Sequence, residues 1–156
     1  MRAFFFATMA AVVAGVTSAQ ALTPHDGWRI LQTQISYDDL VERLNKSVQA
    51  NKMSLVTRAS ATSGAKAAGI SIPGNMIVGV FRNDFARRML AASVAAGIEA
   101  PIRYYITENT DHTATLSYKV PSAVFAPYFE DGGADLKALS RELDTLFAKI
   151  ADQAVQ

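Results

Sequence analysis

Five residues in the middle of the chain have the chemistry of an anion-binding site. They are two arginines, an asparagine, a glutamate and a tyrosine, namely Arg82, Asn83, Arg103, Glu108 and Tyr118. If the fold brings them to one end of a sheet, two guanidinium groups and an amide can bind a carboxylate or another small anion, with the tyrosine ring as a wall. The same residues also suit structural roles: Arg103 can pair with an acid, Asn83 can cap a helix and Tyr118 can join the core. Both interpretations remain open from the sequence alone.

Three aromatic residues further along the chain form a second candidate surface. Phe125, Tyr128 and Phe129 fall in an expected loop before the last helix. Clustered aromatic side chains are frequent contacts for a protein partner or a second copy of the chain. They also pack loops onto a core, so a partner contact and a packed loop are both open interpretations.

No spacing of nucleophiles, bases or metal ligands is typical of a known catalytic site. Ser63 and Lys66 have the S-x-x-K spacing of serine acyl-transferases, but the companion S-D-N and K-T-G elements are absent, which favours an exposed pair on a short helix. The two histidines, His25 and His112, lack the spacing of a metal site. Phosphate-loop and dinucleotide motifs are also absent. We therefore predict no metal and no cofactor, and we assign no catalytic residue.

The composition is that of one globular domain with no basic field. The chain has 156 residues, of which 50% are hydrophobic and 19% charged, with 15 Lys and Arg against 14 Asp and Glu. Such a balance argues against a nucleic-acid partner. The sequence contains no cysteine, which excludes disulfides and thiolate metal sites.

The first 21 residues have the form of a secretory signal peptide. Met1 and Arg2 precede an apolar run from Ala3 to Val16, and Ala19-Gln20-Ala21 has the small-x-small form of a signal-peptidase site. We expect the mature chain to begin near Leu22, with zero net charge, in the periplasm or outside the cell; an uncleaved anchor is the alternative. No other long apolar stretch follows, so the sequence predicts no membrane span after cleavage.

Hydrophobic patterns predict five strands, of which the last is the clearest. In "TATLSYKV" the apolar and polar residues alternate strictly, as in a half-buried strand, and we expect it to pair with the strand before it as a hairpin. "MIVGVF" has no polar face and predicts a central strand buried on both sides. The five expected strands cover residues 28–35, 53–62, 76–81, 101–108 and 113–120.

Three longer helices are expected between and after these strands. Ser36 with Asp39 resembles a capping box for a helix over 37–51. A second helix is expected from a cap at Asn83 or Asp84 to a stop at Gly97, and a third carries an apolar stripe over 136–150. These elements predict one α+β domain over residues 22–156, a two-layer sandwich with a mostly antiparallel sheet and helices packed on one face.

Several short motifs in the middle of the chain together carry a family resemblance. They are Ala68-Gly69-Ile70, Phe81-x-Asn83, Met89-Leu90, Gly97-Ile98, Pro101-Ile102-Arg103, Glu108 and "LSYKVPS". With them the chain resembles the domain of unknown function 302 family over about residues 33–130. The resemblance implies a small bacterial α+β domain, often exported, without an established activity. Where many relatives have Phe-Gly-Asn-Pro before the helix, this chain has Phe81-Arg82-Asn83-Asp84.

Two functions remain compatible with these observations. The first is a non-enzymatic exported domain that binds a small anionic ligand or an envelope protein, or pairs with itself as a homodimer. The second is a hydrolase or transferase without a recognised catalytic motif. The lack of cysteine and the scarcity of histidine favour the first.

Overall fold

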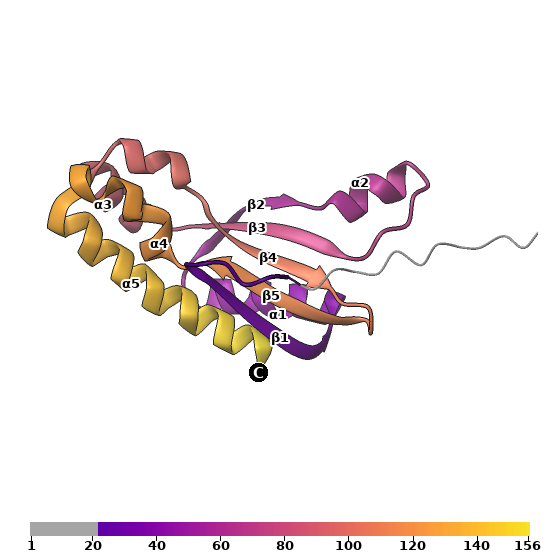
Figure 1. The fold of residues 1–156 in the computed structure, drawn as a ribbon. Helices are drawn as coiled ribbons and strands as arrows, with labels where there is room; N and C mark the ends of the chain where they lie inside the picture. Colours follow the sequence, from indigo (N-terminus) through magenta and orange to yellow (C-terminus); the bar gives the residue numbers. More distant parts are fainter. Residues whose placement is uncertain (1–21) are drawn as a thin grey trace, which may run out of the picture.

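A five-stranded antiparallel sheet forms the framework of the protein (Figure 1). The computed structural model describes residues 22–156, so the predicted signal peptide lies outside the described residues. The strand order is β1-β5-β4-β3-β2, and every neighbouring pair is antiparallel. The strands are β1 (Trp28–Ser36), β2 (Ser54–Ala59), β3 (Asn75–Phe81), β4 (Ile102–Glu108) and β5 (Thr113–Lys119). The first and second strands therefore occupy opposite edges of the sheet.

Helices cover one face of this sheet, which confirms the predicted α+β architecture. The helical segments are α1 (Tyr37–Ala50), α2 (Ala61–Ala67), α3 (Asn83–Ala92), η1 (Ala95–Glu99), α4 (Pro121–Phe125), η2 (Ala126–Tyr128) and α5 (Phe129–Val155). The α1 and α5 helices pack against each other and against the sheet. Figure 1 shows α2 at one end of the sheet and α3 with η1 at the other. Among residues 22–156, no helix has the length and apolarity needed to cross a membrane.

The core lies between the helices and alternate residues of the strands. Leu40, Leu44 and Val48 on α1 are completely buried, and so are Tyr104 and Leu116 on β4 and β5. Since successive side chains of a strand point to opposite faces, the residues between them face away from the helices. Each central strand therefore contributes to the core and to an uncovered face at the same time.

The predicted start of α1 is confirmed in detail. Ser36 is the N-cap, and its hydroxyl oxygen accepts the Asp39 backbone N–H at 3.3 Å while the hydroxyl donates to the Asp39 carboxylate at 2.7 Å. A cap of this kind satisfies one of the free N–H groups of the first turn and stabilises a helix by about 1 kcal/mol.

The prediction that β3 is buried on both sides is wrong. This strand has neighbours on both edges, β2 and β4, but only one face lies under helices. Val78 and Val80 point into the core, whereas Ile77 on the other face is 39% exposed. An apolar run can thus mark a strand whose second face borders an open surface.

The second predicted helix ends earlier than expected. The α3 helix stops at Ala92, Gly97 lies within the following 3-10 segment η1, and Arg82 occupies the N-cap without a side-chain capping bond. The Ser93 hydroxyl accepts the Ala96 N–H and donates to the carboxylate of Asp131 in α5, which redirects the chain at this point. Beyond the helix end, Val94 and Ile98 are exposed, whereas Ala96 is completely buried.

The last helix is longer than its apolar stripe suggested and bends near its start. It spans Phe129–Val155, and Gly133 within it has φ 56° and ψ −147°, a conformation essentially restricted to glycine. The short α4 helix fills the expected loop before it.

Gly79 gives a direct test of the packing between β2, β3 and β4. A Cβ atom at this position would collide with the Thr57 hydroxyl oxygen and lie 2.8 Å from the Pro101 ring. We expect Gly79→Ala to lower the free energy of unfolding by about 1–3 kcal/mol, because the proline ring cannot move away without shifting the backbone. Urea denaturation would measure the change.

Gly64→Ala is the matched control. No atom outside its immediate surroundings lies within 4 Å of the new Cβ, and the residue sits in a helix. This substitution should be neutral or stabilising by up to about 1 kcal/mol. Equal effects of the two substitutions would contradict the close approach at Gly79.

Candidate functional site

The uncovered face of the sheet holds a hollow of about 820 Å³. It extends from the start of β1 across β5 and β4 to β3 and is bounded at one end by η1 and η2. This volume lies in the range of small-molecule sites. It is much larger than the pocket beside Phe85 and Phe147, which holds about 40 Å³, and we therefore take it as the candidate functional site.

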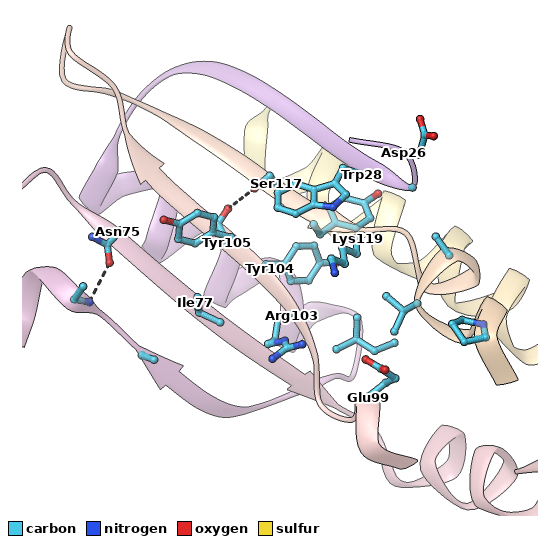
Figure 2. A pocket seen from close by; sticks show the side chains of 18 residues that line it. Asp26, Trp28, Asn75, Ile77, Glu99, Arg103, Tyr104, Tyr105, Ser117 and Lys119 are labelled. Atoms are coloured by element: carbon cyan, nitrogen blue, oxygen red, sulfur yellow. Dashed lines mark hydrogen bonds between the residues drawn. The ribbon is translucent and has the colours of Figure 1, made fainter. Parts of the chain in front are cut away.

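Two aromatic side chains flank the floor of the hollow. Trp28 begins β1 and Tyr105 lies in the middle of β4, with β5 between them. Figure 2 shows both rings beside Ser117 of β5. Ser117 is completely buried, and its hydroxyl donates to the Tyr105 carbonyl oxygen at 3.4 Å. Beyond Tyr105, the exposed side chain of Ile77 extends the apolar surface onto β3.

Two basic side chains belong to the same face of the sheet. Arg103 lies two residues before Tyr105 on β4, and Lys119 lies two residues after Ser117 on β5, so the alternation of the strands turns all four toward the hollow. Within residues 22–156, neither Arg103 nor Lys119 forms an ion pair within 4.0 Å. Both side chains are exposed.

Two acidic side chains border the hollow as well. Asp26 precedes β1, and Glu99 ends η1, four residues before Arg103. The Glu99 carboxylate accepts a hydrogen bond from the Tyr128 hydroxyl at 2.8 Å, and this bond is the main cause that raises the pKa of Tyr128. The bond ties η1 to η2 and holds one oxygen of Glu99, while its other oxygen remains available.

The structure separates the five residues predicted to form an anion site. Arg103 alone places its side chain in the hollow. Arg82 donates from Nε to Asp84 at 2.7 Å, and its guanidinium lies 4.1 Å from the centre of the Phe85 ring. That ion pair lowers the pKa of Asp84. Asn83 is the exposed first residue of α3 and does not cap it.

Tyr118 borders the hollow through its position in β5, but its ring belongs to the core. Its ring centre lies 5.2 Å from that of Tyr104 and 5.8 Å from that of Phe147. Burial is the largest cause that raises the pKa of Tyr118, and Arg29 donates to its hydroxyl at 3.5 Å. The ring therefore faces α5 and is not a wall of the hollow.

Glu108 lies at the opposite end of β4 from Arg103. Its carboxylate accepts the Gly74 backbone N–H at 2.7 Å and is 2.9 Å from Nδ1 of His112. These bonds close the β4–β5 turn onto the loop before β3. The hydrogen bond with His112 is the main cause that lowers the pKa of Glu108.

The predicted aromatic partner surface divides between core and rim. Phe125 is 1% exposed and belongs to the core. Tyr128 is half-buried beside Glu99, and Phe129 is half-buried with the ammonium of Lys137 5.8 Å from its ring centre. Only Tyr128 and Phe129 present surface to a partner.

Sequence reasoning missed most of the residues that line the hollow. Trp28, Tyr105, Lys119, Asp26 and Glu99 come from five different segments. The alternation in "TATLSYKV" already placed Ser117 and Lys119 on the polar face of their strand. In the expected hairpin, this face lies beside the face of the preceding strand that carries Arg103 and Tyr105. Combining the two faces could have identified the site from the sequence.

Comparison with known proteins gives a family and a fold. The family model described as "Domain of unknown function DUF302" matches residues 30–154, which confirms the resemblance read from the motifs. The crystal structure of an uncharacterized conserved protein DUF302 from Bacillus stearothermophilus superposes with a TM-score of 0.73 at 15% sequence identity, over 83% of this chain and 99% of that chain. At this identity the likeness concerns the fold alone. No curated protein matches the chain.

The contacts of Glu108 predict an acid-dependent contribution to stability. Because its pKa is lower in the folded than in the unfolded chain, the stabilisation is present above the ordinary value of 4.5 and is lost as the pH falls through the folded-state pKa. We expect Glu108→Gln to lower the free energy of unfolding by about 1 kcal/mol at pH 7, with the difference vanishing in acid. Urea denaturation at a series of pH values would measure it.

A variant of the neighbouring residue provides the control. His112 has φ 65°, which asparagine tolerates, so His112→Asn removes the imidazole and leaves the Gly74 contact intact. It should lose the larger part of the acid-dependent stabilisation and keep the part that comes from the Gly74 contact. A Glu108→Gln protein with unchanged stability at every pH would show that the turn does not depend on this carboxylate.

Proposed function

Because the chain belongs to the domain of unknown function DUF302 family, whose description names no activity, we propose its function from the chemistry of the hollow. This function is the non-catalytic binding of a small organic acid on the open face of the sheet. The carboxylate of the ligand would meet Arg103 and Lys119. Its apolar body would lie along Trp28, Tyr105 and Ile77. Of the two functions compatible with the sequence, this is the binding function.

One observation carries the proposal. Two basic side chains border a hollow with aromatic walls, and within the described residues neither has an ion-pair partner. Some arginines elsewhere on the surface are paired with acids, as in Arg29 with Asp152 and Arg88 with Glu142, whereas Arg43 within the described residues is not. An open guanidinium beside an aromatic ring suits a planar carboxylate, because its donors are arranged for bidentate binding.

The exposure of these cations sets the strength of binding. Arg103 and Lys119 are both in contact with solvent, so each contributes less than a buried charge and is screened by salt. Contact of an aromatic or aliphatic body with the two rings would add apolar burial at about 25 cal/mol per Å². We therefore expect weak binding that decreases clearly at high ionic strength.

The floor of the hollow favours binding over catalysis. The Ser117 hydroxyl is buried and donates to a backbone carbonyl, so it is not poised to attack a ligand. In the described part of the chain, the residues that line the hollow include neither histidine nor cysteine. A nucleophile with an adjacent base, as acyl transfer requires, has no counterpart among these side chains.

Export remains part of the proposal and rests on residues 1–21. The charged start, the apolar run and the Ala19-Gln20-Ala21 site support a cleaved signal peptide. A binding domain of this kind would meet its ligand in the periplasm or outside the cell.

Binding can be tested with 3-phenylpropionate, which joins a carboxylate to an aromatic body. Trp28 is the single tryptophan of the chain, so its fluorescence reports occupation of the hollow. We expect a saturable change of this fluorescence and about tenfold weaker binding by Arg103→Met, equivalent to about 1.4 kcal/mol. Isothermal titration calorimetry provides an independent measure of the same affinity.

Arg43→Met is the matched control, because Arg43 is exposed on α1 and has no ion pair within the described residues. It should bind as the unaltered protein does. Equal affinity of the Arg103 and Arg43 variants would refute the anion site.

Cleavage of the signal peptide can be tested in a Gram-negative host. The protein recovered by osmotic shock should begin near Leu22, as intact mass and N-terminal sequencing would show. Ala21→Tyr should abolish cleavage, whereas Gln20→Ala should not, since only the outer two positions of the site must be small. Retention of the chain from Met1 in the cytoplasm would contradict export.

A further inference from the structure

The charged residues of the hollow form two couples, each made of one acidic and one basic residue. Glu99 and Arg103 flank the turn that joins η1 to β4, four residues apart. Asp26 and Lys119 lie at the ends of paired strands, because Lys119 is opposite Trp28 in the β1–β5 register. Figure 2 shows Glu99 and Arg103 at the end of the hollow where η1 leads into β4.

Both couples are open. Within residues 22–156, no ion pair within 4.0 Å joins Glu99 to Arg103 or Asp26 to Lys119. By contrast, Arg82 and Asp84, only two residues apart, are joined at 2.7 Å.

Glu99 is the better oriented of the two acids. It is half-buried, and the Tyr128 hydroxyl holds one of its oxygens, whereas Asp26 is exposed. A carboxylate fixed beside an open guanidinium presents both signs of charge to one ligand. A simple organic acid would satisfy Arg103 but would also bring its own negative charge near Glu99, which costs free energy.

We infer that the hollow is built for a zwitterion, namely a free α-amino acid with an aromatic or aliphatic side chain. Its carboxylate binds Arg103, its ammonium group binds the available oxygen of Glu99, and its side chain lies along Tyr105 and Ile77. The ammonium and carboxylate groups of an α-amino acid are attached to the same carbon. Their close spacing suits Glu99 and Arg103, which lie near each other without forming an ion pair. This inference rests on the proposed function and names the class of its ligand.

Three probes that share one benzene ring separate the contributions. L-phenylalanine carries both charges, 3-phenylpropionate only the carboxylate, and phenethylamine only the ammonium group. Trp28 fluorescence, excited where phenylalanine does not absorb, and calorimetry would give the affinities. We expect L-phenylalanine to bind about tenfold more tightly than 3-phenylpropionate and more tightly still than phenethylamine.

Variants of the acid identify its role. Glu99→Gln should abolish the preference for L-phenylalanine over 3-phenylpropionate, because it removes the charge that attracts the ammonium group. Tyr128→Phe should reduce that preference and leave binding of 3-phenylpropionate nearly unchanged, since it only frees the Glu99 carboxylate. Glu130→Gln, at an exposed acid of α5 outside the hollow, is the control and should keep the full preference.

The outcomes distinguish this inference from the proposed function. If 3-phenylpropionate binds as tightly as L-phenylalanine, the zwitterion is refuted while the acid-binding function stands. If none of the three probes binds, both are refuted. If native mass spectrometry shows a ligand-free dimer that Arg103→Met dissociates, the open face is a contact between copies, and the amino-acid site is refuted as well.

Discussion

Helices cover only one face of the five-stranded sheet, and this asymmetry determines which side chains enter the core and which border the hollow. The α1 and α5 helices bury one side of five antiparallel strands, and the other side has no such layer. Because neighbouring residues of a strand point to opposite sides, each central strand serves two environments. In β4, Tyr104 is completely buried and donates to the Phe147 carbonyl oxygen, while Arg103 and Tyr105 on either side of it face the hollow. Core packing thus positions the candidate site residue by residue.

The charges around the hollow depend on contacts between distant parts of the chain. The pairing of β1 with β5 places Lys119 opposite Trp28, although 90 positions separate them in the sequence. Tyr128 holds Glu99 through a hydrogen bond that joins two 3-10 segments. The hydrogen bond holds the Glu99 carboxylate, whereas the side chains of Asp26, Arg103 and Lys119 are exposed.

The two incorrect structural predictions have a common origin. The apolar run in β3 was taken as a sign of burial on both faces, and the helix that begins near Asn83 was expected to continue to Gly97. In the structure Ile77 is 39% exposed, and Val94 and Ile98 are 78% and 79% exposed. Periodicity shows which side chains share a face, but burial depends on whether another element covers that face. The anion-site prediction was limited in the same way: it supposed that these residues meet at one end of the sheet, whereas Glu108 lies at the opposite end of β4 from Arg103 and Arg82 pairs with Asp84.

By itself, the sequence determined the local features of this protein: the alternation of β5, the cap at Ser36, the apolar faces of the helices and the motifs of the family. These depend on residues close together in the chain, which is why pattern and propensity suffice to predict them. Only the tertiary structure decided that Tyr118 joins the core, that Glu108 closes a turn, and that Trp28 and Lys119 meet across one hollow. Such outcomes follow from strand register and from which face the helices cover, and neither is set by interactions between neighbouring residues.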